Sequence, residues 1–347
     1  MNEFLKNRPD QPESHDSAPP EPLKPYTDLE NKIYDRIDVY LYRLNELVSQ
    51  KERTPYTFQA YQNSLKRFYD WGKERGFPKV DPPLIERYKE FLIQEGLQPA
   101  TINLYLVALR QFFEYYAKNK WIAYNPVRLV RGVKQKTGIH KKNALTIDEA
   151  QRLLSVIKRP VASPRAQVRE NRDYAIIYLM LKTGLRAIEA VRAQVEDIKT
   201  KEGEKVLYVL GKGDREKLKF VVLAAEVYNA LMDNLTVRGF SKPEDPLFAK
   251  LILPTKSGRP KSLTTRALEQ IVLKYMLKAG IKTPDNPRSE ITLHSLRHTT
   301  ANLALDGGAP VVNVQEMMRH EDITTTMIYV KQWNRVKQAA ELHIKQI

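Results

Sequence analysis

Six residues with chemically useful side chains lie in the second half of the chain, and their types favour chemistry at an anionic group. Each alone is weak evidence, because a lone tyrosine beside apolar neighbours is usually a half-buried packing residue. As a set they combine guanidinium and ammonium groups, which bind anionic oxygens, with imidazoles, which transfer protons, and a phenol, which can act as a nucleophile. In chain order the set is Arg186, Lys212, His294, Arg297, His320 and Tyr329.

Four short segments carry this set. Arg186 follows a glycine in LKTGLRAIEA, and GKGDRE places Lys212 at the tip of a predicted hairpin. LHSLRHTT holds His294 and Arg297 three residues apart, so both project from one face of a helix. The fourth segment, RHEDITTTMIYV, has the last histidine of the set near its start and the tyrosine near its end. Chance rarely produces this order of residues.

The chain is strongly basic. It has 347 residues, with 57 Lys and Arg against 41 Asp and Glu, which gives a formal net charge of +16. A charge of this sign and size favours a large polyanion as the partner, and nucleic acid is the leading candidate. A membrane surface is disfavoured, because no basic amphipathic helix stands apart from the core-like patterns.

Features of an exported or membrane-spanning protein are missing from the sequence. No run of about 18 uncharged apolar residues occurs. The first residues, MNEFLKNRPDQPESHDSAPPEP, lack the apolar core of a signal peptide. The absence of cysteine excludes disulfides, thiol catalysis and cysteine-ligated zinc. We therefore expect a cytoplasmic protein that is associated with the nucleoid through a nucleic-acid partner.

Composition and periodicity predict two folded domains. Residues 1–27 are rich in proline and carry more acid than base, which is typical of a disordered tail. Residues 28–126 repeat apolar residues at spacings of three and four and are expected to form a helical domain. The segment 127–143 is dense in Lys and Arg and is interpreted as a basic linker, either a solvated connector or a strap along phosphates. Residues 144–347 form the second domain.

The second domain is expected to combine helices with a small sheet. LTIDEAQRLLSVIK opens with a capping box made by Thr146 and Glu149. KVLYVL and KLKFVVL, separated by GKGDRE, predict a β-hairpin. A final helix is expected to start near Trp333. The other predicted helices are 145–158, 172–182, 264–279, 292–305 and 310–318. The predicted fold class is thus mainly α with a small antiparallel β-sheet.

These motifs resemble those of the tyrosine recombinases, the family that includes phage integrases, Xer recombinases and Cre. TGLR, GKG, HSLRH and RHEDITTTMIY match the family's active-site motifs, and YTFQAYQNSLKRFYDWG with PATINLYLVALRQFFEYY resembles its core-binding domain. The resemblance runs from about Asn31 to the C-terminus. Two departures are mild. Ala190 stands where a leucine is usual after Glu189, and Arg319 stands where a glycine commonly precedes the histidine.

The resemblance implies a site-specific DNA recombinase, or integrase, that cuts and rejoins strands without a metal, ATP or another cofactor. The Tyr329 phenol would attack phosphorus, displace a deoxyribose oxygen and form a 3′-phosphotyrosyl link beside a free 5′-hydroxyl. Because this link keeps the energy of the phosphodiester, the 5′-hydroxyl of another strand can reverse the step and reseal the DNA.

The other motif residues then have expected roles. Arg186 and Arg297 would clamp the non-bridging phosphate oxygens. His294 is the natural group to take or share the phenol proton, and Lys212 would protonate the leaving oxygen. His320 would donate to a phosphate oxygen.

The resemblance also implies partners. Double-stranded DNA would be bound by a homotetramer on two DNA sites, with an accessory or directionality protein as a further candidate partner. The last helix either packs on its own domain or, as in the family, docks onto a neighbouring protomer. Glu189 is expected to orient the site by hydrogen bonding, and His298 is expected to be structural.

Other classes of protein fit the sequence less well. A type IB topoisomerase shares the chemistry, but the separate helical domain and the apolar C-terminal helix argue against it. A DNA-binding factor that no longer cuts would not need all six residues of the set. An RNA-binding module is disfavoured because no exposed aromatic strand motif occurs. A metal nuclease would need clustered carboxylates, and none lies near the basic motifs.

Overall fold

The computed structural model separates the chain into two compact units, Met1–Thr137 and Gly138–Ile347. It describes residues 33–50, 52–76, 79–134, 144–157, 163–211, 216–239, 242–250, 260–288 and 290–337. The expected tail, residues 1–27, therefore lies outside the described part of the chain. Each unit has its own hydrophobic core.

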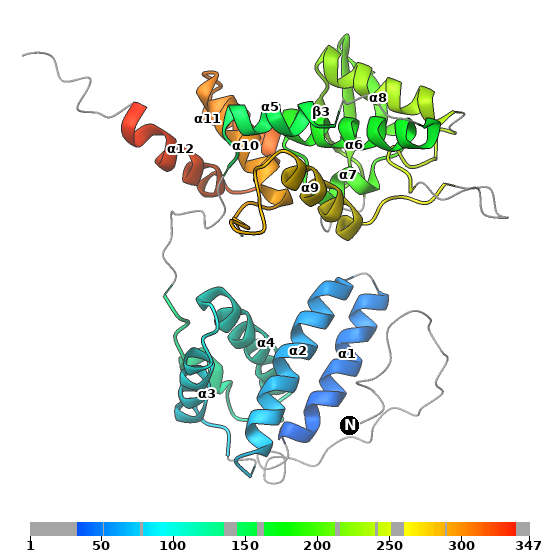
Figure 1. Ribbon diagram of the computed structural model, residues 1–347. Helices are drawn as coiled ribbons and strands as arrows, with labels where there is room; N and C mark the ends of the chain where they lie inside the picture. The colour runs from blue at the N-terminus through cyan, green and yellow to red at the C-terminus, as the bar shows by residue number, and fades with distance from the viewer. Residues whose placement is uncertain are drawn as a thin grey trace, which may run out of the picture. The chain divides into compact units, whose positions relative to one another are not determined.

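The first unit is helical, as predicted. Proline at the start of α2, α3 and α4 suits the first turn, where the missing N–H has no helical partner. The Thr54 hydroxyl caps α2 by accepting from the Thr57 N–H, and the Asp81 carboxylate caps α3 by accepting from the Leu84 N–H. The elements are η1 (Ile33–Arg36), α1 (Ile37–Ser49), α2 (Pro55–Lys73), α3 (Pro82–Gln94), α4 (Pro99–Lys118) and η2 (Pro126–Leu129) (Figure 1).

Aromatic rings fill the core of this unit. The Phe68 and Tyr88 rings meet edge to face at 5.1 Å between centroids, and Phe112 meets Phe113 in the same way at 4.9 Å. Both geometries suit the ring quadrupoles. α2 packs against both α1 and α4. The apolar residues that recur at spacings of three and four in the sequence therefore face one shared core.

The first unit extends further than Pro126, where the sequence places its end. Val127 and Val130 are buried in its core. The Asn103 amide donates to the Val133 carbonyl (2.9 Å) and accepts from the Val133 N–H (2.8 Å). Of the expected linker 127–143, the described part up to Lys134 is thus bound to the helical unit, and 135–143 lies outside the described residues.

The second unit combines helices with a three-stranded antiparallel sheet of order β1-β2-β3. This confirms the predicted fold class and the hairpin, in which Val206 pairs with Val222 and Val209 with Lys219. The elements are α5 (Ile147–Ser155), α6 (Pro164–Thr183), α7 (Ala187–Arg192), η3 (Val195–Asp197), β1 (Ile198–Lys201), β2 (Glu204–Val209), β3 (Lys219–Val222), α8 (Ala225–Arg238), α9 (Thr265–Lys278), α10 (Leu293–Asp306), α11 (Val311–Met318) and α12 (Ile323–Lys337).

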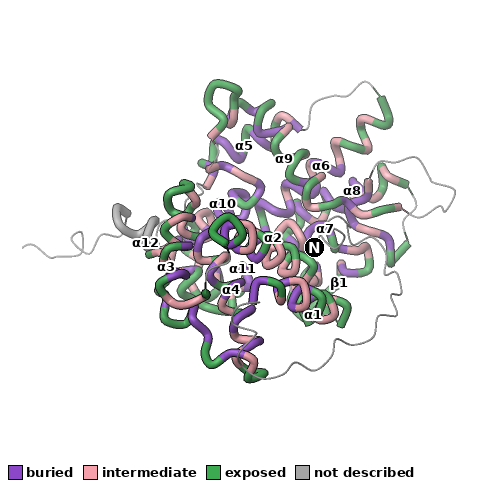
Figure 2. Tube along the Cα trace, turned by 90° about the horizontal axis from the view of Figure 1, so that it is seen from below, coloured by how far each residue is buried: buried purple, intermediate pink, exposed green. Residues whose placement is uncertain are grey.

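α6 is the central helix of this unit. It packs against α8 and α10, and its second half is almost entirely buried. The buried segments are purple in Figure 2. The capping box of Thr146 and Glu149 forms at the start of α5 as predicted. The helix α10 is likewise buried along most of its length.

Five features of the second unit differ from the prediction. α6 starts at Pro164, eight residues before the expected 172, because Ser163 caps it and proline suits its first turn. The strand β1 and the helices α7 and α8 were not predicted. The last helix begins at Ile323 rather than near Trp333, so Tyr329 lies on a helix. The threonines that precede Tyr329 have low helix propensity, which the packing of α12 on α10 and α11 overrides.

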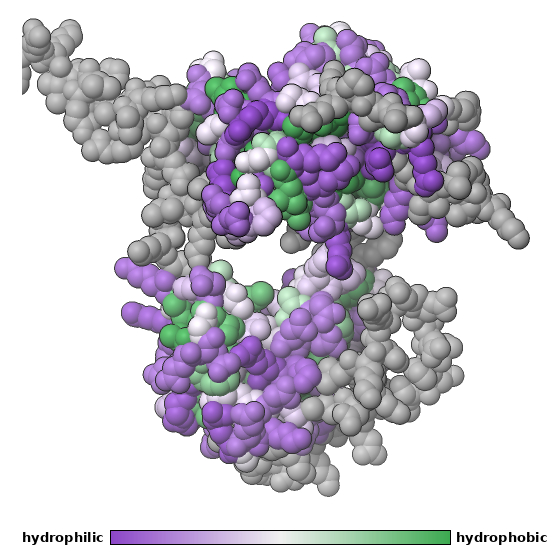
Figure 3. Space-filling view, viewed as in Figure 1, coloured by the Kyte–Doolittle hydropathy of each residue, from purple (hydrophilic) through white to green (hydrophobic). Residues whose placement is uncertain are grey.

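The surface of the described residues is mainly hydrophilic on the face drawn in Figure 3, with scattered apolar patches. Among the described helices, none is long and apolar enough to cross a bilayer.

Candidate active site

The end of α6 places the first arginine of the site. Gly184 ends the helix in the left-handed conformation (φ 61°, ψ 27°), and a Cβ there would lie 2.8 Å from the Met318 sulfur. Two separate features therefore require glycine at position 184: the left-handed backbone conformation and the close approach of α11. Two residues later Arg186 is the N-cap of α7, with about a third of its side chain exposed.

Arg297 reaches the same turn from α10 and is 1% exposed. Its guanidinium donates to the Gly184 carbonyl and to the Met318 carbonyl. Burial, followed by the charges of Arg186 and Arg319, lowers the pKa of Arg297 to about 9. Arg297 thus stays charged at neutral pH. The Thr300 hydroxyl, one turn further, lies 2.9 Å from the Leu181 carbonyl and ties α10 to the end of α6.

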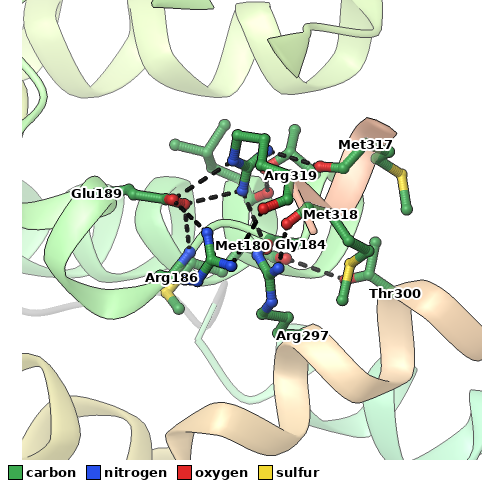
Figure 4. Close-up of polar contacts among 11 residues, drawn as sticks. Met180, Gly184, Arg186, Glu189, Arg297, Thr300, Met317, Met318 and Arg319 are labelled. Atoms are coloured by element: carbon green, nitrogen blue, oxygen red, sulfur yellow. Dashed lines mark hydrogen bonds and ion pairs between the residues drawn. The ribbon is translucent and has the colours of Figure 1, made fainter. Parts of the chain in front are cut away.

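The end of α11 supplies the acceptors that hold three guanidinium groups (Figure 4). The carbonyl of Met317 accepts from Arg319, that of Met318 from Arg297, and that of Arg319 from Arg186. The last carbonyls of a helix have no partner within the helix and carry its negative dipole end. The carbonyls at the C-terminus of α11 therefore bind the guanidinium groups of all three arginines.

Glu189 is the anion of this cluster and is 1% exposed. Its carboxylate accepts from the backbone N–H of Arg186 at 2.8 Å and from the Arg186 guanidinium at 2.9 Å. It also accepts from Arg319 at 2.8 Å. Burial alone would raise the pKa of Glu189, but the charges and hydrogen bonds of Arg319 and then Arg186 outweigh burial and lower it.

Tyr329 lies inward on α12, 3% exposed. Its hydroxyl is 2.7 Å from Nδ1 of His298. Burial raises the pKa of Tyr329 to about 12, against the lowering effect of the Arg297 and Arg186 charges. The phenol is therefore neutral at physiological pH.

His320, just after the end of α11, is half-buried and lies beside the tyrosine. Its ring is nearly parallel to that of Tyr329, with 6.4 Å between centroids, and its Nδ1 is 2.8 Å from the Thr326 hydroxyl. Burial, followed by the charges of Arg297 and Arg186, lowers the pKa of His320 to about 4. This imidazole is neutral near pH 7.

His294 is exposed at the start of α10, and its ring centroid is 4.9 Å from that of His298. A cavity of about 420 Å³ lies beside it, and its lining includes His294, Arg297 and apolar residues such as Leu185 and Ile291. His298 thus lies within hydrogen-bond distance of the phenol oxygen, and His294 lines a cavity.

The structure brings five of the six predicted site residues into one region of the second unit: Arg186, His294, Arg297, His320 and Tyr329. The sixth, Lys212, lies outside the described residues. The strands on either side of it are present, and the Gly211 carbonyl accepts from Arg192 at 3.2 Å. Within the described part of the chain, no group of three or more His, Asp or Glu side chains is arranged to hold a metal ion.

Three contacts of the site were not predicted from the sequence. They are the His298 contact to the phenol, the Thr326 contact to His320, and the ion pair of Arg319 with Glu189. Arg319 was visible in the sequence as a departure from the family pattern, but nothing in the sequence pointed to its partner.

Comparison with known proteins agrees with this geometry. Residues 143–335 match the phage integrase family, and residues 42–120 match the SAM-like N-terminal domain of phage integrases. The chain is 31% identical to the tyrosine recombinase XerC of Thermodesulfovibrio yellowstonii, over 82% of this chain and 89% of that protein. It is 27% identical to XerD of Listeria innocua, over 85% and 93%.

A solved structure of the XerH recombinase in a post-cleavage complex with its difH substrate shares the fold. Its TM-score is 0.66 at 24% identity, with 82% of this chain and 79% of that chain covered. The helical unit, the mixed unit and the cluster of arginines, histidines and tyrosine define a tyrosine recombinase. The chain belongs to the phage integrase family and is a site-specific recombinase that acts on DNA.

Proposed function

We propose that Tyr329 is the nucleophile that cuts DNA. Its oxygen attacks a phosphodiester phosphorus, the bond from phosphorus to the 5′-oxygen breaks, and a 3′-phosphotyrosyl link forms. The proton of the phenol passes to a base, and the leaving oxygen receives a proton. The observation that carries this proposal is that one tyrosine lies among three arginines and three histidines, with ring or hydrogen-bond contacts to two of the histidines.

Arg186 and Arg297 are proposed to bind the phosphate. Arg186 is the more accessible of the two arginines. Arg297 lines the same cavity as His294. Each guanidinium has five N–H groups, so the contacts to carbonyls of α11 leave donors for phosphate oxygens. Their charges offset the negative charge that grows in the transition state.

His320 is proposed to donate to a phosphate oxygen. It is neutral at pH 7, and we assign the Thr326 hydroxyl as the donor to Nδ1, so that the ring carries its proton on Nε2. This tautomer leaves Nε2–H as the donor. Lys212 is proposed to protonate the leaving 5′-oxygen, on the basis of its place in the GKG motif.

Two histidines are candidates for the base that takes the phenol proton. His294 faces the cavity with Arg297 and is accessible to a substrate. His298 is the side chain that lies within hydrogen-bond distance of the phenol. We propose His294 as the base and His298 as the group that holds the phenol before DNA is bound. The burial of Tyr329 supports this division, because a phenol at 3% exposure must become exposed before it can reach a phosphate.

Double-stranded DNA is the proposed substrate, and the proposed assembly is a homotetramer on two DNA sites, with α12 linking the protomers. An accessory or directionality protein would select the direction of exchange. Crystals of lambda integrase contain a dimer on a core site, which supports assembly on DNA within the same fold. The proposed location is the cytoplasm, at the nucleoid, where the DNA substrate is found.

The test is covalent trapping in EDTA. The wild-type chain and Tyr329→Phe are incubated with nicked fragments of DNA from the source locus, denatured, and assayed for protein-linked DNA. Adducts are expected from the wild type alone, because the variant loses only the attacking oxygen. Tyr228→Phe, a half-buried tyrosine on α8, is the matched control and should form adducts as the wild type does. Adducts from Tyr329→Phe, or strict dependence on magnesium, would reject the proposal.

A further inference from the structure

Arg319 is an unusual residue in an unusual backbone conformation. It follows α11 with φ 53° and ψ 46°, the left-handed region that a residue with a Cβ rarely occupies. Its side chain is only 3% exposed. A buried arginine held in an unfavourable conformation persists only when its surroundings require it.

The contacts of Arg319 show what requires it. Its guanidinium meets the Glu189 carboxylate at 2.8 Å and donates to the carbonyls of Met317 (2.6 Å) and Gly184 (3.3 Å). Glu189 is the same carboxylate that holds Arg186. Figure 4 shows Glu189 between the two guanidinium groups.

The charge balance of the cluster depends on this arginine. Arg186, Arg297 and Arg319 contribute three positive charges and Glu189 one negative charge, which leaves a net charge of +2. Without Arg319, the carboxylate would be opposed by Arg186 alone among its ion-pair partners, and the net charge would fall to +1. Charges at these distances and depths of burial interact strongly.

We propose that Arg319 is a positioning residue for DNA cleavage: it neutralises Glu189 from within the protein, so that this carboxylate orients Arg186 without cancelling its charge toward the phosphate. This inference rests on the proposed function. Arg319 itself is not placed to bind the phosphate, because its side chain is 3% exposed and four of its five N–H groups are directed to Glu189 and to the two carbonyls.

The experiment compares three substitutions at this position. Arg319→Gly removes the side chain and suits the left-handed backbone, so the fold is expected to survive. Arg319→Gln keeps most of the volume without the charge, and Arg319→Lys keeps the charge without the planar fork. Each is assayed by the single-turnover rate of adduct formation on a nicked duplex cut from a fragment that the wild type captures. DNA affinity and thermal unfolding are measured on the same samples.

We expect the glycine and glutamine variants to form adducts on the order of 10- to 100-fold more slowly, as for a displaced catalytic group. The lysine variant should recover most of the rate. DNA affinity should stay close to that of the wild type, because Arg319 is buried. Arg152→Gln is the control, since it removes an arginine from an exposed ion pair with Asp148 in the same unit.

If the glycine and glutamine variants form adducts at the wild-type rate, this inference is wrong, while the proposed function is unaffected. Equal losses in the lysine and glutamine variants would also overturn it, because they would show that shape matters and charge does not. If the wild type forms no adduct at all, the proposed function fails first and this inference fails with it.

Discussion

Tyr329 and its two histidine neighbours show how residue chemistry is set by burial. The phenol is neutral because it is buried, and His320 is neutral because burial and nearby arginines disfavour a further positive charge. Near neutral pH the positive charge around Tyr329 is therefore carried by the arginines and not by His320. Two predictions belong to this scale.

Replacing His294 and His298 separately should distinguish the base from the group that holds the phenol. His294→Gln should slow adduct formation about 100-fold or more, in the range for loss of a general base. His298→Gln should slow it less, and should lower the free energy of unfolding by about 1 kcal/mol through the loss of the contact to Tyr329. Single-turnover cleavage and urea unfolding measure the two effects. A larger cleavage defect in His298→Gln would make His298 the base.

The stability of the chain should depend on pH through His320. Its pKa is about 4 in the folded protein, and its ordinary value is 6.5. The unfolded chain therefore binds this proton at a higher pH than the folded chain. The resulting stability is present above pH 6.5 and is lost as the pH falls toward 4. We expect the urea unfolding free energy to fall over this window, and to fall less in His320→Gln. The same pH dependence in both proteins would contradict this assignment.

At the scale of elements, the site depends on where α6 and α11 end. Gly184 and Arg319, both left-handed, end these helices, and the carbonyls at the two ends accept from the site arginines. Because the turn after α6 is filled by the Met318 sulfur, it has no space for a Cβ. One prediction follows from this geometry.

Gly184→Ala should destabilise the second unit and impair cleavage. The substitution combines an unfavourable φ of 61° with a contact of 2.8 Å to Met318, and we expect a loss of about 1–3 kcal/mol from the backbone alone. Gly203→Ala is the matched control, because φ is 86° there and no atom lies within 4 Å of the added Cβ. Urea unfolding and adduct formation should be affected more at Gly184. Equal effects at both positions would show that the Met318 contact is unimportant.

The sequence predicts elements well where apolar spacing and caps are clear, as in α5 and α9. It fails at α12, where threonines hide a helix whose formation depends on burying Thr326 and Tyr329. It also missed α8, although the buried residues Val227, Ala230, Leu231 and Asn234 recur at the helical spacings of three and four. The motif residues could be named in advance, but the partner of the phenol could not. That partner is set by how α10 and α12 pack, which no local pattern records.

At the scale of the whole molecule, the net charge of +16 is carried by a chain whose two units are each compact. The core of the first unit is rich in aromatic rings packed among aliphatic side chains, and that of the second is mostly aliphatic. Because both cores consist of hydrophobic residues, most charged side chains lie outside them, where they can contact phosphates.

DNA binding should weaken steeply with salt. If six or more phosphates are contacted, affinity should fall roughly 1000-fold or more between 50 and 200 mM salt, because bound counterions are released. Gel-shift titrations at several salt concentrations measure the slope. Tyr329→Phe should give the same slope as the wild type, since it changes no charge at neutral pH. An affinity that is independent of salt would contradict a phosphate-based interface.

The shared end of α11 has a consequence for how this enzyme can vary. Because one helix terminus holds Arg319 and the two arginines that are proposed to bind phosphate, a displacement of α11 moves all three guanidinium groups together. Substitutions at the buried residues that seat this helix, Val314 and Met318, would therefore show epistasis with substitutions at the arginines. Buried apolar residues that are not part of the proposed site thus influence how well substitutions at the arginines are tolerated.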